Sequence, residues 1–99
     1  MPNISASMEL IFRPSYNRDL RKISNKEVLS RLASIFRQIE NANGIEDIGS
    51  LKKLREYTHY YRVKIKISEK HDYRLVLMIR NNKVWAESIA LAKKIFYKR

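Results

Sequence analysis

The stretch that decides the fold is YYRVKIKISEKHDYRLVLMI, residues 60–79. Apolar and basic side chains alternate along its first half, with the period of two that is typical of a β-strand whose two faces differ. One face of this strand carries the cations Arg62, Lys64 and Lys66. The other face carries the apolar set Tyr61, Val63, Ile65 and Ile67. The pattern therefore predicts a strand that packs one face on a core and turns a row of cations away from it.

Two further strands are predicted after this one. The polar segment SEKHD separates residues 59–67, the first strand, from residues 73–80, which carry Arg74 near their start. Asn81 and Asn82 then tolerate the positive φ that a two-residue hairpin turn requires. Residues 83–89 are β-prone and follow directly, so the sequence predicts three consecutive antiparallel strands.

The N-terminal half predicts one strand and two helices. Residues 8–12, MELIF, form a short run of strand formers that ends before Pro14, a residue that suits the first turn of a helix. Tyr16, Leu20 and Ile23 then recur at the spacing of a short amphipathic helix. The tetrapeptide from Ser24 to Glu27 is S-x-x-E, a capping-box pattern that predicts the start of a second helix.

The second helix is predicted from a continuous apolar stripe, which the segment Asn41–Gly44 ends. The stripe consists of Val28, Leu29, Leu32, Ile35, Phe36 and Ile39.

The predicted order is β-α-α-β-β-β, an α+β fold. Residues 45–58 form a connecting segment, residues 1–7 a loose extension, residues 91–98 a short C-terminal helix or tail, and residues 8–99 one domain. Two helices can cover only one face of a twisted antiparallel sheet. We therefore expect the apolar face of the central strand under the helices, the cations on the open face, and Trp85 in the core.

The charge of the chain is concentrated in its second half. The 99 residues carry a formal net charge of +11, and residues 51–99 hold 14 Lys and Arg against four Asp and Glu. Residues 1–50 hold seven basic residues against six acidic ones. A field concentrated on one part of a protein attracts a polyanion or an acidic protein. We expect a negatively charged partner.

Several kinds of site are disfavoured by composition. The chain has no cysteine, so it has no disulfide framework and no thiolate zinc site. Its two histidines, His59 and His71, lie without metal-ligand spacing, and its two glycines cannot build a phosphate-binding glycine loop. The sequence shows neither a signal peptide nor an apolar run of the roughly 20 residues that span a membrane. We expect a cytoplasmic protein without a metal, a small-molecule cofactor or a membrane partner.

The cations and the interleaved tyrosines are suited to RNA. A basic sheet face binds phosphates, and tyrosine rings stack on bases. Such a face could also cleave RNA, because negative charge builds on the phosphoryl oxygens when the ribose 2′-OH attacks the adjacent phosphorus, and fixed cations stabilise that charge. A lysine among other cations, with its pKa lowered by them, could act as the general base. Solvated strand cations without any catalytic role remain the alternative.

Three short runs together resemble a known family. LKKL at residues 51–54, YRVKI at residues 61–65 and DYRLV at residues 72–76 are similar to the signature of the RelE/ParE toxin superfamily of bacterial type II toxin–antitoxin systems. The resemblance extends over about residues 8–97. It implies a small α+β toxin that a cognate acidic antitoxin neutralises. RelE-type members cleave mRNA in the ribosomal A site without a metal.

The resemblance also implies roles for individual residues. Arg62 and Lys64 match two strand lysines that contact RNA and act as base or charge stabiliser, and Arg74 matches the arginine that stabilises the transition-state phosphate. Leu91 and Ala92 stand where the family carries a basic or His-Arg pair, a departure that Lys93 or Lys94 could compensate. Tyr97 could stack on a base or share acid–base duty. The predicted catalytic set is Arg62, Lys64, Arg74, Lys93 and Tyr97, and the predicted RNA-binding set is Lys52, Lys53, Lys66 and Lys94.

Two other functions remain open at this point. A ParE-like or catalytically decayed toxin would act by protein binding, such as gyrase inhibition, and the apolar Leu91 and Ala92 favour it. A plain RNA-binding module is the other alternative, although the predicted element order is not that of an RRM, β-α-β-β-α-β.

Overall fold

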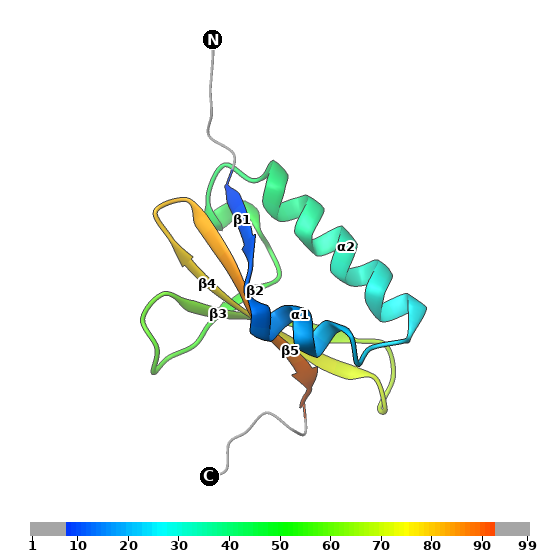
Figure 1. Cartoon of the computed structure of the whole chain (residues 1–99). Helices are drawn as coiled ribbons and strands as arrows, with labels where there is room; N and C mark the ends of the chain where they lie inside the picture. The colour runs from blue at the N-terminus through cyan, green and yellow to red at the C-terminus, as the bar shows by residue number, and fades with distance from the viewer. Residues whose placement is uncertain (1–7, 93–99) are drawn as a thin grey trace.

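The computed structural model describes residues 8–92 of the chain (Figure 1). The predicted N-terminal extension and all but the first two residues of the predicted C-terminal helix lie outside this range. Leu91 belongs to a strand. The elements in chain order are β1 (Glu9–Phe12), α1 (Pro14–Leu20), α2 (Lys26–Asn41), the 3-10 helix η1 (Ile45–Asp47), β2 (Leu51–Lys53), β3 (Tyr60–Lys66), β4 (Asp72–Arg80) and β5 (Lys83–Leu91).

The strands form one five-stranded sheet in the order β1-β5-β4-β3-β2. Strands β3, β4 and β5 pair with one another in antiparallel fashion, as predicted, and β2 adds to β3 in the same sense. Asn81 and Asn82 form the turn before β5 with φ of 50° and 63°. The expectation of a wholly antiparallel sheet is wrong at one edge, because β1 pairs with β5 in parallel. Strand β2 lies in the segment predicted as a connection. The predicted α+β fold is otherwise confirmed.

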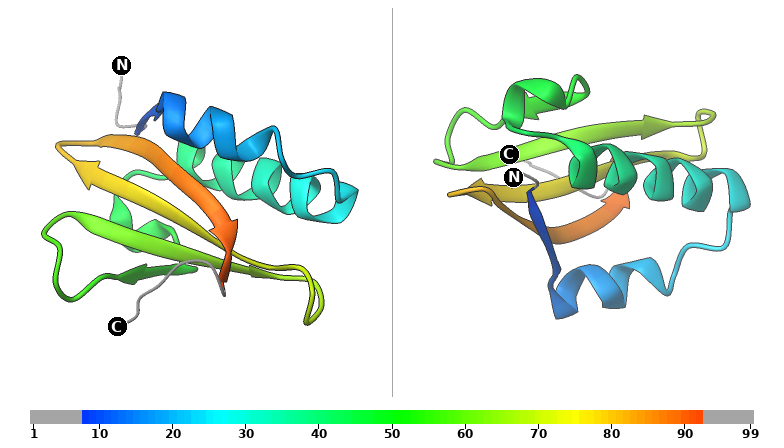
Figure 2. Two further views of the ribbon diagram at one scale, coloured as in Figure 1. Left: turned by 60° about the horizontal axis from the view of Figure 1, so that its bottom comes forward. Right: turned by 90° about the horizontal axis from the view of Figure 1, so that it is seen from above.

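Both helices lie on one side of the sheet and leave its other side open (Figure 2). Pro14 begins α1. Ile23 is buried but lies after the end of α1, in a turn in which the N–H of Ile23 donates to the carbonyl of Leu20 at 3.0 Å. The cap of α2 is Asn25 and not Ser24. Its side-chain oxygen accepts from the N–H groups of Glu27 at 2.9 Å and Val28 at 3.0 Å, satisfying two of the donors that a helix start leaves free. Within residues 8–92, no helix is long and apolar enough to span a membrane.

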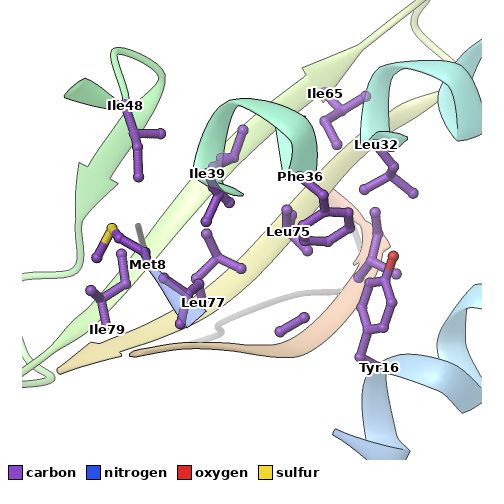
Figure 3. Packing of buried hydrophobic residues seen from close by; sticks show 14 of the residues in the cluster. Met8, Tyr16, Leu32, Phe36, Ile39, Ile48, Ile65, Leu75, Leu77 and Ile79 are labelled. Atoms are coloured by element: carbon purple, nitrogen blue, oxygen red, sulfur yellow. The ribbon is translucent and has the colours of Figure 1, made fainter. Parts of the chain in front are cut away.

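The hydrophobic core fills the space between the helices and the sheet (Figure 3). The inward faces of β3 and β4 contribute Val63, Ile65, Leu75 and Leu77, each at most 1% exposed. Helix α2 supplies its predicted stripe from above, including Leu32, Phe36 and Ile39. Phe12, Tyr16 and Phe36 form an aromatic cluster in which the rings of Phe12 and Phe36 meet edge to face, with centroids 5.1 Å apart. Tyr61 packs against this core, as its place on the apolar face predicts, and Tyr73 does so too.

A bulge in β5 changes which of its side chains are buried. Val76 of β4 lies opposite Ser88, whereas Leu77 lies opposite Ala86, so Glu87 is an extra residue in β5. Buried positions therefore change from even to odd numbers, from Val84 and Ala86 to Ile89. Trp85 alternates with Val84 and Ala86 and does not belong to the core cluster. The prediction that Trp85 anchors the core is wrong.

Candidate nucleic-acid interface

The sheet has an open face, defined as the face opposite the helices. Because directly paired residues of neighbouring strands share a face, the register places Lys52, Arg62, Lys64 and Arg74 together on it. Their neighbours along the strands, Val63, Ile65 and Leu75 among them, are buried on the helix side. The alternation in residues 60–67 thus has the structural basis that the sequence predicts.

The four cations form two adjacent rows across the sheet. In one row Lys52 of β2 lies opposite Arg62 of β3, and in the next Lys64 of β3 lies opposite Arg74 of β4. Directly opposite residues have Cβ atoms about 4.5–5.5 Å apart, and like charges in that position are destabilising. The fold therefore tolerates two unfavourable cation pairs side by side. A bound polyanion would relieve this repulsion. We call these two rows the cationic rows.

Within residues 8–92, Arg74 is the one of these four cations that forms an ion pair. Its side chain is 18% exposed, and its Nη1 donates to the carboxylate of Asp72, which is 23% exposed, and to the Tyr73 carbonyl at 3.3 Å. Asp72 and Arg74 lie two residues apart on β4 and so share the open face. The contacts to Asp72 and Tyr73 both use Nη1. Neither the Nη2 nor the Nε donor of the guanidinium forms a hydrogen bond within residues 8–92.

Lys66 lies at the end of β3, opposite Asp72. Its Nζ bonds to the carboxylate of Glu69 at 3.2 Å, and the two side chains are 41% and 93% exposed. An ion pair this exposed contributes only about 0–1 kcal/mol. Lys66 therefore lies at the margin of the cationic rows, and its ion pair with Glu69 restrains its side chain only weakly.

The remaining predicted residues are divided by the structure. Lys52 lies opposite Arg62, whereas Lys53 lies opposite Tyr61 and so shares the side of the sheet that carries the helices. The prediction grouped these two lysines, but only Lys52 joins the cationic rows. Three others, Lys93, Lys94 and Tyr97, lie outside the described residues, and their roles stay predictions.

Two features of the open face were missed from the sequence. Asp72 was not predicted to take part, although a carboxylate two residues before a strand arginine signals an ion pair on one face. Arg13, which directly follows β1, was not predicted to take part either. Its guanidinium lies 5.9 Å from the centroid of the Trp85 ring, and its Nε donates to Glu87 at 3.1 Å. Among residues 8–92, no group of three or more His, Asp or Glu side chains is placed to hold a metal ion.

Solved structures with a similar fold include toxins of toxin–antitoxin systems. The YoeB–YefM complex from Staphylococcus aureus has 25% sequence identity and a TM-score of 0.64, with 93% of this chain and 100% of that chain covered. Toxin RelE from E. coli, solved as a double mutant in the free state, has 24% identity and a TM-score of 0.67, covering 88% and 85%. The RelB–RelE antitoxin–toxin complex from Methanococcus jannaschii has 19% identity and a TM-score of 0.66, covering 84% and 91%.

No protein-family model matches the sequence, and no curated protein matches it. The similarity is therefore one of structure. The fold is like that of the RelE and YoeB structures above, with a mostly antiparallel sheet and two helices on one side. The resemblance seen in residues 51–54, 61–65 and 72–76 is confirmed at this level.

Proposed function

We propose that this protein is the toxin of a type II toxin–antitoxin module and acts in the cytoplasm. Two of the similar solved structures are complexes of such a toxin with its antitoxin. The charge of the chain supports an acidic antitoxin, because residues 51–99 hold 14 basic residues against four acidic ones. The antitoxin would neutralise the toxin by covering the cationic rows.

We further propose that the toxin is an endoribonuclease that cleaves mRNA in the ribosomal A site without a metal. The observation that carries this proposal is the direct cross-strand pairing of Lys64 with Arg74, one row from Arg62. Residues two apart on a strand are about 7 Å apart. The three side chains can therefore surround one phosphate and the ribose that precedes it.

The reaction divides the work among these side chains. The ribose 2′-oxygen attacks the adjacent phosphorus while its proton passes to a base, and the bond from phosphorus to the 5′-oxygen breaks as that oxygen gains a proton. The products are a 2′,3′-cyclic phosphate and a 5′-hydroxyl. Arginine stays protonated in proteins, so Arg62 and Arg74 supply only charge and N–H donors to the phosphoryl oxygens. Lys64 can exchange a proton, and we assign it as the base.

Mapping of mRNA 5′ ends in a translation reaction tests this proposal. Addition of the purified toxin should create new ends within A-site codons. Arg74→Ala should reduce their rate of formation by roughly 10²–10³, the range for loss of one donor to a developing oxyanion. Arg37→Ala removes an exposed arginine from α2 and serves as the matched control, with an unchanged rate. Equal cleavage by the Arg74→Ala variant would exclude the assignment.

The ion pair between Asp72 and Arg74 favours a second candidate, a ParE-like or decayed toxin that acts by binding a protein. The carboxylate already partly neutralises the guanidinium that the ribonuclease mechanism needs. Under this candidate the toxin would inhibit DNA supercoiling by gyrase and create no new mRNA ends. The two assays together separate the candidates.

A further inference from the structure

An apolar row lies beside the cationic rows on the open face. Four side chains from four neighbouring strands stand directly opposite one another in it. From β1 to β3 these are Ile11, Trp85, Met78 and Tyr60. We call this set the apolar row.

The apolar row does not serve the hydrophobic core. All four side chains are partly exposed, and none belongs to the core cluster or to the partly buried residues that pack on it. Their direct strand neighbours, such as Val84, Leu77 and Ile79, are the buried ones. The apolar row therefore offers an aromatic and thioether surface to a ligand outside the domain.

The position of the apolar row relates it to the cationic rows. Tyr60 lies two residues before Arg62 on β3, and Met78 lies two residues after Val76, which is opposite Arg62. The apolar and cationic rows are thus neighbours, about 7 Å apart along the strands. This distance allows one nucleotide to contact both, with its phosphate on cations and its base on the apolar row.

Both ends of the apolar row carry groups that stack on bases. At the β1 edge, the guanidinium of Arg13 lies 5.9 Å from the Trp85 ring centroid and is held by Glu87. At the β3 end, the ring of Tyr57 is 59% exposed and lies 6.1 Å from the ring of Tyr60. Aromatic rings and guanidinium planes are the surfaces on which proteins stack the bases of single-stranded RNA.

We propose that the apolar row is a base-binding platform, on which Trp85 stacks a base of the single-stranded RNA whose phosphates lie on the cationic rows. The inference rests on the proposed RNA substrate and names the residues that hold its bases. RNA fits better than an acidic protein segment because each nucleotide joins an anionic phosphate to a flat base, matching the adjacent cationic and apolar rows. Stacking is tolerant of sequence because every base has a π-face, so the platform would act on many codons.

The experiment compares two ligands of equal charge. One is a short single-stranded RNA with 2′-O-methyl groups, which cannot be cleaved, and the other is an abasic oligomer with the same number of phosphates. Trp85 is the only tryptophan of the chain, so its fluorescence reports on the platform directly. The base-containing RNA should quench this fluorescence and bind at least about fivefold more tightly than the abasic oligomer, as one stacked base implies. The abasic oligomer should leave the fluorescence nearly unchanged.

Variants then assign the effect to the platform. Trp85→Leu, followed through the anisotropy of a labelled RNA, should bind both ligands alike and with the affinity that the wild type has for the abasic one. Phe12→Leu changes an aromatic residue that is 45% exposed on the helix side, and it should keep the wild-type preference. Tyr60→Leu should weaken the preference at the other end of the apolar row.

The outcomes separate this proposal from the ribonuclease assignment. If the wild type binds both ligands equally and its fluorescence does not respond, the platform is overturned, whatever the cleavage assay gives. If base-dependent quenching is present but ribosomes show no cleavage, the platform stands and the ribonuclease assignment falls.

Discussion

Lys52 and Lys53 are adjacent in sequence and equal in charge, but they belong to opposite sides of the sheet. Lys52 lies opposite Arg62 in a cationic row, whereas Lys53 lies opposite Tyr61. Replacing either with alanine removes one positive charge from an exposed position of β2. The two variants therefore form a matched pair that differs only in the side of the sheet from which the charge is removed. We expect Lys52→Ala to weaken RNA binding and Lys53→Ala to leave it nearly unchanged.

The size of the effect follows from the number of cations on the cationic rows. Among residues 8–92, no acidic side chain forms an ion pair with Lys52, Arg62 or Lys64. Each phosphate contact contributes about 0.7 to the slope of log affinity against log salt concentration for a single strand. These three cations predict a slope of about −2 or steeper. Lys52→Ala should make the slope shallower by about 0.7.

Fluorescence anisotropy of a labelled, uncleavable single-stranded RNA, titrated at several salt concentrations, measures both slopes. A slope for Lys53→Ala that changes as much as that of Lys52→Ala would mean that general charge attracts the RNA. An unchanged slope for Lys52→Ala would remove this lysine from the contact surface. Either result would contradict the division of the sheet into an open cationic face and a covered one.

Three further outcomes are expected. Asp72→Asn removes the carboxylate that partly neutralises Arg74, so RNA binding should tighten and its salt slope should steepen by up to about 0.7; weaker binding would contradict this. Burial raises the pKa of Tyr16 to about 12, above its value near 10 in the unfolded chain. Between pH 10 and 12 the folded state therefore keeps a proton that the unfolded chain loses, and the free energy of unfolding should fall by about 2–3 kcal/mol. Urea unfolding should show no such contribution in Tyr16→Phe, and an identical alkaline loss would refute it. Asn25→Ala should cost about 1 kcal/mol in unfolding free energy and Ser24→Ala much less, because the Asn25 side chain caps α2; the reverse order would restore Ser24 as the cap.

The sequence predicted those parts of the fold that depend on local periodicity. The alternation around Arg62 and Lys64 gave β3 and its two faces, and the apolar stripe gave α2 almost to the residue. The Asn81–Asn82 turn was predicted because asparagine tolerates the positive φ that both residues adopt. In each case the signal lies within a few neighbouring residues.

The missed parts depend on contacts that are distant in sequence. Strand β2 is only three residues long, and it exists because it pairs with β3, so no periodicity could reveal it. The parallel pairing of β1 with β5 joins residues more than seventy positions apart. The extra residue Glu87 changes the buried positions of β5, so Trp85 lies outside the core, although simple alternation from Ile89 would bury it. The sequence predicted Ser24 as the cap of α2, whereas the structure has Asn25 in this position. Both residue types cap helices well, so residue type did not distinguish them.

The candidate site was predicted in composition but not in arrangement. The resemblance to RelE-type toxins singled out Arg62, Lys64 and Arg74, and the register shows that Lys64 and Arg74 are direct neighbours. The motif did not reveal that Asp72 occupies one nitrogen of Arg74. The spacing of two residues on a strand places both side chains on one face and so signals an ion pair, but it does not specify which nitrogen of the guanidinium the carboxylate contacts.

The central claim is that neighbouring cations of the open face act together on one phosphate. The most direct measurement is the single-turnover rate of mRNA cleavage on ribosomes with a defined A-site codon, for the wild type, Lys64→Ala, Arg74→Ala and the double variant. Residues that act as a unit are not additive. The account predicts that each single change removes most of the rate and that the double change costs far less than the product of the two. Wild-type cleavage that neither substitution slows would contradict it.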